Sequence, residues 1–186
     1  SDRILPTVCP WTDDGVWCIV DTGCNTSVHS IDWRKNSVEK MEARKSWGDE
    51  LPPMKAFYTR RFNRSFGGLG GQHAAKSIGK RQWRMAQMST LDQAFPWSSV
   101  ETTELLGGDI PMLLGLDLMR SQGIKFDPTT NRGTRKSPGK GIEMEIPVAQ
   151  CAGSRLPMIR VDQYEETDNF WSKTKLGRMK DWDRSL

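Results

Sequence analysis

The sequence is poor in the residues that build metal centres and membrane spans. Its 186 residues include two histidines, His29 and His73, and four cysteines, none of which stands in a Cys-x-x-Cys pair. This spacing argues against a zinc site, so we expect no metal and no cofactor. No apolar stretch approaches the length needed to span a bilayer, and the polar first residues lead into Pro6. We therefore expect neither a membrane anchor nor a signal peptide.

Acidic residues are absent from one long segment, residues 55–84, which carries eight basic residues. The whole chain has a net charge of +4 and a pI near 8.9. A basic segment of this kind is typical of a solvated hairpin face, and the alternative is attraction to an acidic peptide or nucleic acid. No aromatic stacking platform or nucleic-acid-binding module accompanies the charge, so we do not expect nucleic acid to be the main partner.

An apolar run ends abruptly in a carboxylate: residues 17–23 read Trp-Cys-Ile-Val-Asp-Thr-Gly. A buried strand that delivers Asp21 into a tight turn places the acid where apolar surroundings control its protonation. The alternative is an aspartate that starts an ordinary turn after a strand. The chain contains no second Asp-Thr-Gly and no Asp-Ser-Gly.

Two further motifs follow in order. Residues 66–71 read Phe-Gly-Gly-Leu-Gly-Gly, and residues 113–119 read Leu-Leu-Gly-Leu-Asp-Leu-Met. Together with Asp-Thr-Gly, this order resembles the retropepsins, the single-domain aspartic proteases of retroviruses and retrotransposons. The resemblance covers roughly residues 16–130.

The resemblance implies a mostly β fold: a closed retropepsin-like β-barrel of one acid-protease lobe, with one short C-terminal helix, a helical insertion and a glycine-tipped flap hairpin. Residues 116–122 suit the short helix, with Gly123 as its left-handed C-terminal cap. In the insertion, Asn36 and Glu39 resemble a capping box that starts a helix running to Trp47. We expect the protease domain to span residues 1–150. Residues 151–186 mix charges with isolated aromatics and read as a polar linker or partly ordered tail.

The resemblance also assigns roles to ten residues. It implies a catalytic triplet, a set of substrate contacts in the loop and the flap, and two supports below the loop; these are, in turn, Asp21, Thr22 and Gly23; Cys24, Asn25, Gly68, Leu69 and Gly70; and Gly115 and Asp117. Cys24 and Asn25 depart from the residues usual in the family, and His29 stands where an apolar residue is common.

Hydrolysis by an acid pair requires two carboxylates, one to take a proton from water and one to donate a proton to the substrate. One chain supplies one Asp-Thr-Gly, so the resemblance implies a homodimer, with residues 3–8 and 142–148 as candidate interface strands. It further implies a polypeptide substrate: a retroelement polyprotein, cleaved also at the enzyme's own borders, in the cytoplasm or a virus-like particle. The alternatives are a cellular retropepsin-like protease and a non-catalytic dimerisation or peptide-binding module.

Overall fold

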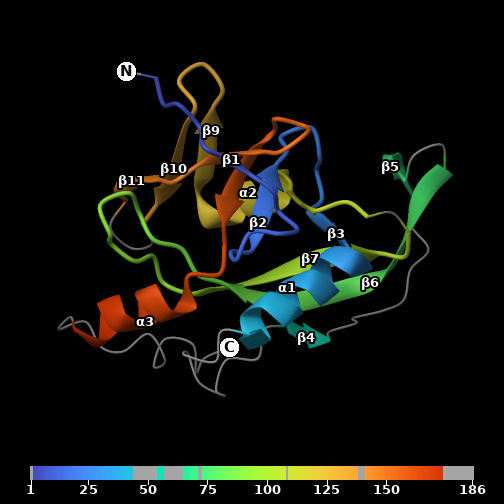
Figure 1. Ribbon diagram of the computed structural model, residues 1–186, viewed down its shortest axis with the longest axis horizontal. Coiled ribbons are helices and arrows are strands. Elements are labelled where there is room, and N and C mark those ends of the chain that lie inside the picture. The colour runs from blue at the N-terminus through green and yellow to red at the C-terminus, as the bar shows by residue number, and fades with distance from the viewer. Residues whose placement is uncertain are drawn as a thin grey trace.

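The computed structural model of the protein describes residues 2–43, 54–56, 65–70, 73–107, 109–137 and 141–173. In this part of the chain, thirteen strands and three helices form a mostly β structure (Figure 1). The strands are β1 (Thr7–Val8), β2 (Trp17–Val20), β3 (Val28–Ser30), β4 (Met54–Ala56), β5 (Ser65–Gly70), β6 (His73–Met85), β7 (Ser98–Leu105), β8 (Met112–Leu114), β9 (Ile124–Asp127), β10 (Arg132–Lys136), β11 (Glu143–Ile146), β12 (Ala149–Cys151) and β13 (Pro157–Arg160). The helices are α1 (Ile31–Ala43), α2 (Leu116–Gln122) and α3 (Tyr164–Ser172). None of the helices in the described part combines the length and apolar character that crossing a bilayer requires.

Ten strands form one sheet in the order β1-β12-β13-β2-β8-β3-β7-β6-β4, with β5 paired to β6. The remaining strands form a separate sheet in the order β11-β10-β9. The large sheet is open: within the described residues, β1 at one end does not pair with β4 at the other. The prediction of a closed barrel is therefore wrong for this part of the chain. Closure depends on register and shear summed over the whole sheet, which local strand patterns do not encode.

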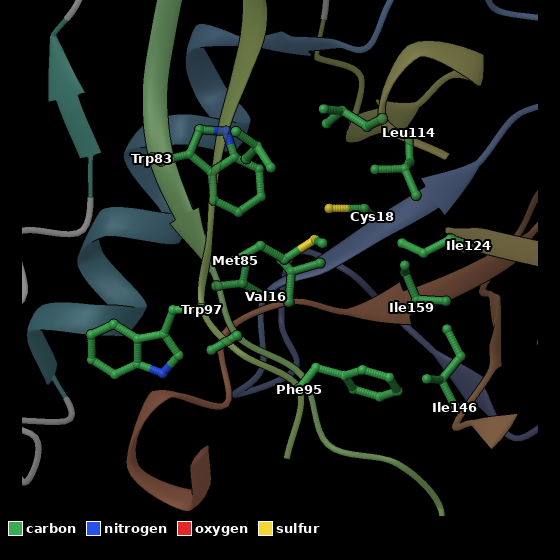
Figure 2. Packing of buried hydrophobic residues seen from close by; sticks show 14 of the residues in the cluster. Val16, Cys18, Trp83, Met85, Phe95, Trp97, Leu114, Ile124, Ile146 and Ile159 are labelled. Atoms are coloured by element: carbon green, nitrogen blue, oxygen red, sulfur yellow. The ribbon is translucent and has the colours of Figure 1, made fainter. Parts of the chain in front are cut away.

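The strand that leads into Asp-Thr-Gly lies inside this sheet, where β2 runs parallel to β8 with Ile19 opposite Leu113. Both faces of β2 are covered, because Cys18 and Ile19 belong to core clusters on its two sides. Figure 2 shows Cys18 among buried side chains from other elements, including Leu114 and Ile159. Burial on both faces explains why the sequence of β2 is a continuous apolar run without alternation.

Helix α1 begins at Ile31, before the predicted N-cap at Asn36. Ser30 caps it instead, because its Oγ accepts a hydrogen bond from the Trp33 amide at 3.1 Å. Asn36 lies within the helix, and its side chain donates to the carbonyl oxygen of Trp11 at 3.1 Å. The prediction of an N-cap at Asn36 is therefore wrong. Strand β3 ends at Ser30, so Ser30 occupies the cap position. The predicted helix end at Trp47 lies outside the described residues.

The short helix α2 and its left-handed cap are confirmed, since Gly123 has φ 64° and ψ 33°. The glycine-rich segment forms an antiparallel hairpin of β5 and β6, which Figure 1 shows projecting from the body; its turn, residues 71–72, lies outside the described residues. The register of β6 against β7 shifts between Ser77 and Gly79, and Gly79 has φ 143°. This bulge bends β6 near the base of the hairpin.

Residues 151–173 belong to the folded body, whereas the sequence predicted a polar linker or partly ordered tail from residue 151. Strand β13 lies between β12 and β2, with Met158 opposite Ile19. Helix α3 buries Trp171, whose indole N–H donates to the carbonyl oxygen of Phe95 at 3.4 Å. A four-residue strand among charged residues is too short to show a period, which is why the sequence pattern missed it. Residues 174–186 lie outside the described part.

Candidate active site

Asp21 stands where β2 leaves the core. Its backbone N–H donates to the carbonyl oxygen of Leu114 at 3.0 Å, which extends the pairing of β2 with β8 by one residue. Its Oδ1 accepts the Gly23 amide at 2.9 Å and closes a turn of the kind that aspartate favours. Asp21 is half-buried, whereas Thr22 and Gly23 are exposed. The Asp-Thr-Gly turn thus faces solvent from the end of a strand fixed in the core.

The turn continues into a loop that packs against the start of α2. The Leu116 amide donates to the carbonyl oxygen of Cys24 at 2.8 Å, and the Asp117 amide donates to that of Asn25 at 3.2 Å. A Cβ atom on Gly115 would lie 2.5 Å from the Cys24 carbonyl oxygen, so this approach requires glycine. The loop after Asp21 and the start of α2, which are far apart in sequence, are therefore joined by backbone hydrogen bonds.

Asp117 fixes the far end of the same loop. Its carboxylate accepts hydrogen bonds from the Ser27 amide at 3.0 and 3.1 Å and from the Ser27 hydroxyl at 2.6 Å. It also accepts the Leu118 amide at 2.8 Å. The Ser27 oxygen in turn accepts the Gly115 amide at 2.9 Å. One serine therefore links both supporting residues to the loop.

The fold brings seven of the ten predicted residues together and places three elsewhere. The seven are Asp21, Thr22, Gly23, Cys24, Asn25, Gly115 and Asp117, while Gly68, Leu69 and Gly70 lie on the hairpin strand β5. Sequence reasoning missed Ser27, because a single serine before a strand is too common to stand out.

The Cys24 thiol is engaged within the loop. It donates to the carbonyl oxygen of Thr26 at 2.8 Å. Burial raises the pKa of Cys24, and the negative charges of Asp21 and Asp117 add to this effect. The thiol is therefore protonated at neutral pH and acts as a hydrogen-bond donor that shapes the loop, not as a nucleophile.

A buried polar cluster lies on β3, the strand that follows the loop. His29 is fully buried, with Nε2 3.2 Å from Glu104 Oε1 and Nδ1 2.8 Å from Thr102 Oγ1. The Trp83 indole N–H donates to the same Thr102 oxygen at 2.9 Å. The Thr102 hydroxyl is then free to donate to Nδ1, which places the hydrogen of the neutral imidazole on Nε2, facing Glu104.

Glu104 has two cationic partners as well. Arg34 contacts its Oε1 from α1, and the Nε atom of Arg81 lies 3.0 Å from the same oxygen. Burial opposes ionisation, but the hydrogen bonds from His29 and the two arginines outweigh it and lower the pKa of Glu104 to about 2. Burial lowers the pKa of His29. At neutral pH an ionised Glu104 beside a neutral His29 joins β3, β6, β7 and α1. The polar His29 within a strand was the sequence signal for this cluster.

Among the described residues, histidine, cysteine, aspartate and glutamate side chains do not gather in groups of three suited to a metal ion. No family model matches the sequence, and no curated protein matches it. Among solved structures, the chain is similar to the retroviral protease-like domain of Ddi1 from Leishmania major, with 14% identity, covering 70% of this chain and 88% of that one, at a TM-score of 0.35. A likeness of this strength does not by itself assign a function.

Proposed function

We propose that this chain is a retropepsin-type aspartic peptidase in which Asp21 activates the attacking water. The observation that carries the proposal is the meeting of two distant motifs: the Asp-Thr-Gly turn and the segment that begins at Gly115 are joined by backbone hydrogen bonds and by the Ser27–Asp117 network. A carboxylate held at the end of a core strand, with its loop fixed on both sides, is suited to a reaction that depends on exact placement of water.

The reaction requires a second carboxylate, and the sequence contains one Asp-Thr-Gly. In the proposal, Asp21 of a second copy supplies it, and two carboxylates at close range share one proton. The ionised carboxylate takes a proton from water as the water oxygen adds to the scissile carbonyl carbon. The protonated carboxyl donates to the carbonyl oxygen. The C–N bond then breaks as the amine takes up a proton.

Two exposed features support a dimer built from residues 3–8 and 142–148. Strand β1 is an end strand of the large sheet, and β11 is an end strand of the small one. Ile4 is 97% exposed and Ile142 is 56% exposed, and each lies beside one of these strands. Edge strands with exposed apolar neighbours are ready to pair with another chain. In the proposal, residues 3–8 and 142–148 form the interface, and the exposed Thr22 hydroxyls bond across the two-fold axis.

The substrate is proposed to be an extended polypeptide that binds between the Asp21 turn and the β5–β6 hairpin. The projection of this hairpin from the body and the bulge at Gly79 support a lid role for Gly68, Leu69 and Gly70. The family resemblance alone favours a retroelement polyprotein as the natural substrate.

The direct test is Asp21→Asn, which keeps the size and the acceptor oxygen of the side chain. We expect loss of peptide hydrolysis with an unchanged circular dichroism spectrum and an unchanged sedimentation profile. Asp14→Asn is a matched control, because it makes the same change of side chain at an exposed position outside the loop. Hydrolysis by Asp21→Asn at a rate near that of the wild type would remove Asp21 from the catalytic role.

Mixing the two proteins tests the shared site. After subunit exchange in an equal mixture, activity should be about a quarter of that of wild type at the same total protein concentration. Only about that share of the dimers keeps two aspartates. A fall to half would mean that each chain acts alone. A folded wild-type dimer that binds peptides without cleaving them would favour the binding-module alternative.

A further inference from the structure

A basic pocket of about 560 Å³ lies at the C-terminal end of α2, whereas the Asp21 loop packs at the N-terminal end. Its wall combines three cationic side chains with three hydroxyls, supplied by Arg120, Arg135, Lys136, Ser98, Ser121 and Ser137. None of the described lining residues is acidic. The volume falls within the range of small-molecule sites.

Arg135 is the unusual member of this wall. It is 1% exposed, yet its hydrogen-bond acceptors are neutral: Gln87 Oε1 at 2.9 Å, Ser98 Oγ at 2.8 Å and Gln122 Oε1 at 3.0 Å. Its guanidinium carbon lies 4.8 Å from the centre of the Phe95 ring. Its buried Nε has no hydrogen-bond partner among the described residues. Burial lowers the pKa of Arg135 to about 10, so the group is still charged at neutral pH.

A buried cation without a carboxylate partner is costly, and such charges are normally paired. Arg135 lines the pocket together with Ser98 and Gln122, the two residues that hold its Nη2 atom, so the buried charge lies in the pocket wall. The end of a helix carries partial negative charge on its last carbonyl oxygens, and the Gly123 N–H offsets part of it by donating to those of Met119 and Arg120. The pocket is therefore electropositive from both its wall and its rim.

The other two cations stand at the rim. Arg120 is an exposed residue in the last turn of α2. Lys136 lies opposite Glu143 across β10 and β11; Glu143 pairs with Lys125 at 2.8 Å and feels the charge of Lys136 more weakly. Both residues line the pocket beside the hydroxyl of Ser137, whereas the Ser121 hydroxyl already donates to the carbonyl oxygen of Leu118 at 3.3 Å.

We propose that this pocket binds a small phosphorylated ligand through its phosphate monoester group. Such a dianion matches the two rim cations, and its three terminal oxygens can accept donors from several walls at once. A planar carboxylate would satisfy fewer of them. The site is separate from Asp21, and the proposal is independent of peptidase activity.

Isothermal titration of the full chain with phenyl phosphate, at ionic strength held constant with chloride, tests this site. Arg120→Gln/Lys136→Gln should raise the Kd at least about tenfold, because two charge-assisted contacts are lost. The charge-matched control Lys35→Gln/Arg155→Gln, at exposed positions elsewhere, should leave the Kd within about twofold. Equal weakening of phenyl phosphate binding by both double variants would overturn a specific site. The same conclusion would follow if titration with phenyl phosphate released no more heat than titration with chloride.

Gln122→Glu provides a second test that does not remove a cation. The new carboxylate would sit at the acceptor position 3.0 Å from Arg135 Nη2 and neutralise the buried charge. We expect a higher Tm and at least about tenfold weaker binding of phenyl phosphate. Wild-type affinity in this variant would overturn the proposal. Succinate, a dicarboxylate, should bind the wild type more weakly than phenyl phosphate, and the reverse order would overturn the assignment to phosphate.

Discussion

Gly115 and Cys24 touch so closely that a Cβ atom on Gly115 would lie 2.5 Å from the Cys24 carbonyl oxygen. The backbone of Gly115, with φ −88° and ψ −176°, is open to any residue. Contact, not backbone strain, therefore selects glycine here. The start of α2 and the loop after Asp21 can come this close because residue 115 has no side chain.

Gly115→Ala should displace the loop that carries Asp21. Overpacking at a rigid backbone contact costs about 1–3 kcal/mol, so the Tm should fall by several degrees. Peptide hydrolysis should fall more steeply than the folded fraction at the assay temperature, because the loop supports Asp21 directly. Gly107→Ala is the control, since among the described residues no heavy atom beyond its chain neighbours lies within 4 Å of its added Cβ. Equal effects of the two substitutions on hydrolysis would contradict the role of this contact.

Stability should decline as the pH falls from 7 towards 2. The pKa of His29 is lowered in the fold, so the unfolded chain binds a proton first and stability drops below about pH 6.5. The pKa of Glu104 is lowered from 4.5 to about 2, so its contribution, on the order of 3 kcal/mol, is lost between those values.

His29→Gln tests the upper part of this range, which lies nearest the ordinary pKa of histidine. The variant should show a flatter dependence of Tm on pH between about 6.5 and 5, whatever its stability at pH 7. The Tm is measured by calorimetry at intervals of pH. A slope identical to that of the wild type above pH 5 would show that His29 does not titrate on unfolding as described.

The hairpin prediction uses Gly68→Val/Gly70→Val. Both glycines lie in β5, in a hairpin that projects from the body (Figure 1), so the Tm should change little. Valine restricts the dihedral changes that a closing lid requires, so kcat/KM should drop steeply. Gly107→Val, on an open bend, controls for the added side chain. Near-normal kcat/KM in the double variant would remove the lid assignment.

Strand β13 should contribute fully to stability. Ile159 is 1% exposed, and Ile159→Ala should cost about 2–5 kcal/mol by urea unfolding. Leu91 is 78% exposed, so Leu91→Ala should cost less than about 0.5 kcal/mol. A small effect of Ile159→Ala would support the sequence-based reading of the segment after residue 150 as a tail.

Local signals in the sequence were sufficient for several elements. The apolar run before Asp21 predicted β2, and Gly123 predicted the end of α2, because each depends on residues adjacent in sequence. The closeness of Gly115 to the loop followed from the family resemblance, whereas the Ser27 hydroxyl that completes the link became visible only in the structure.

Features that depend on distant partners could not be predicted. His29 became interpretable only beside Glu104, Arg34 and Arg81, which come from three other elements. Strand β13 is buried because β12 and β2 flank it, not because its own sequence alternates. The open order of the large sheet is likewise a property of all its strands together.

The pairing of β2 with β8 and β13 also determines when the loop that carries Asp21 can fold. Ile19 lies between Leu113 on one side and Met158 on the other, so both neighbours of β2 are made long after it. Contacts at such separations form late and slow the folding of a domain. On the ribosome, the Asp21 turn has no finished scaffold until the chain beyond residue 160 has emerged. The proposed peptidase would therefore acquire its site only after β13 has been inserted beside β2, and it would be inert while it is being translated.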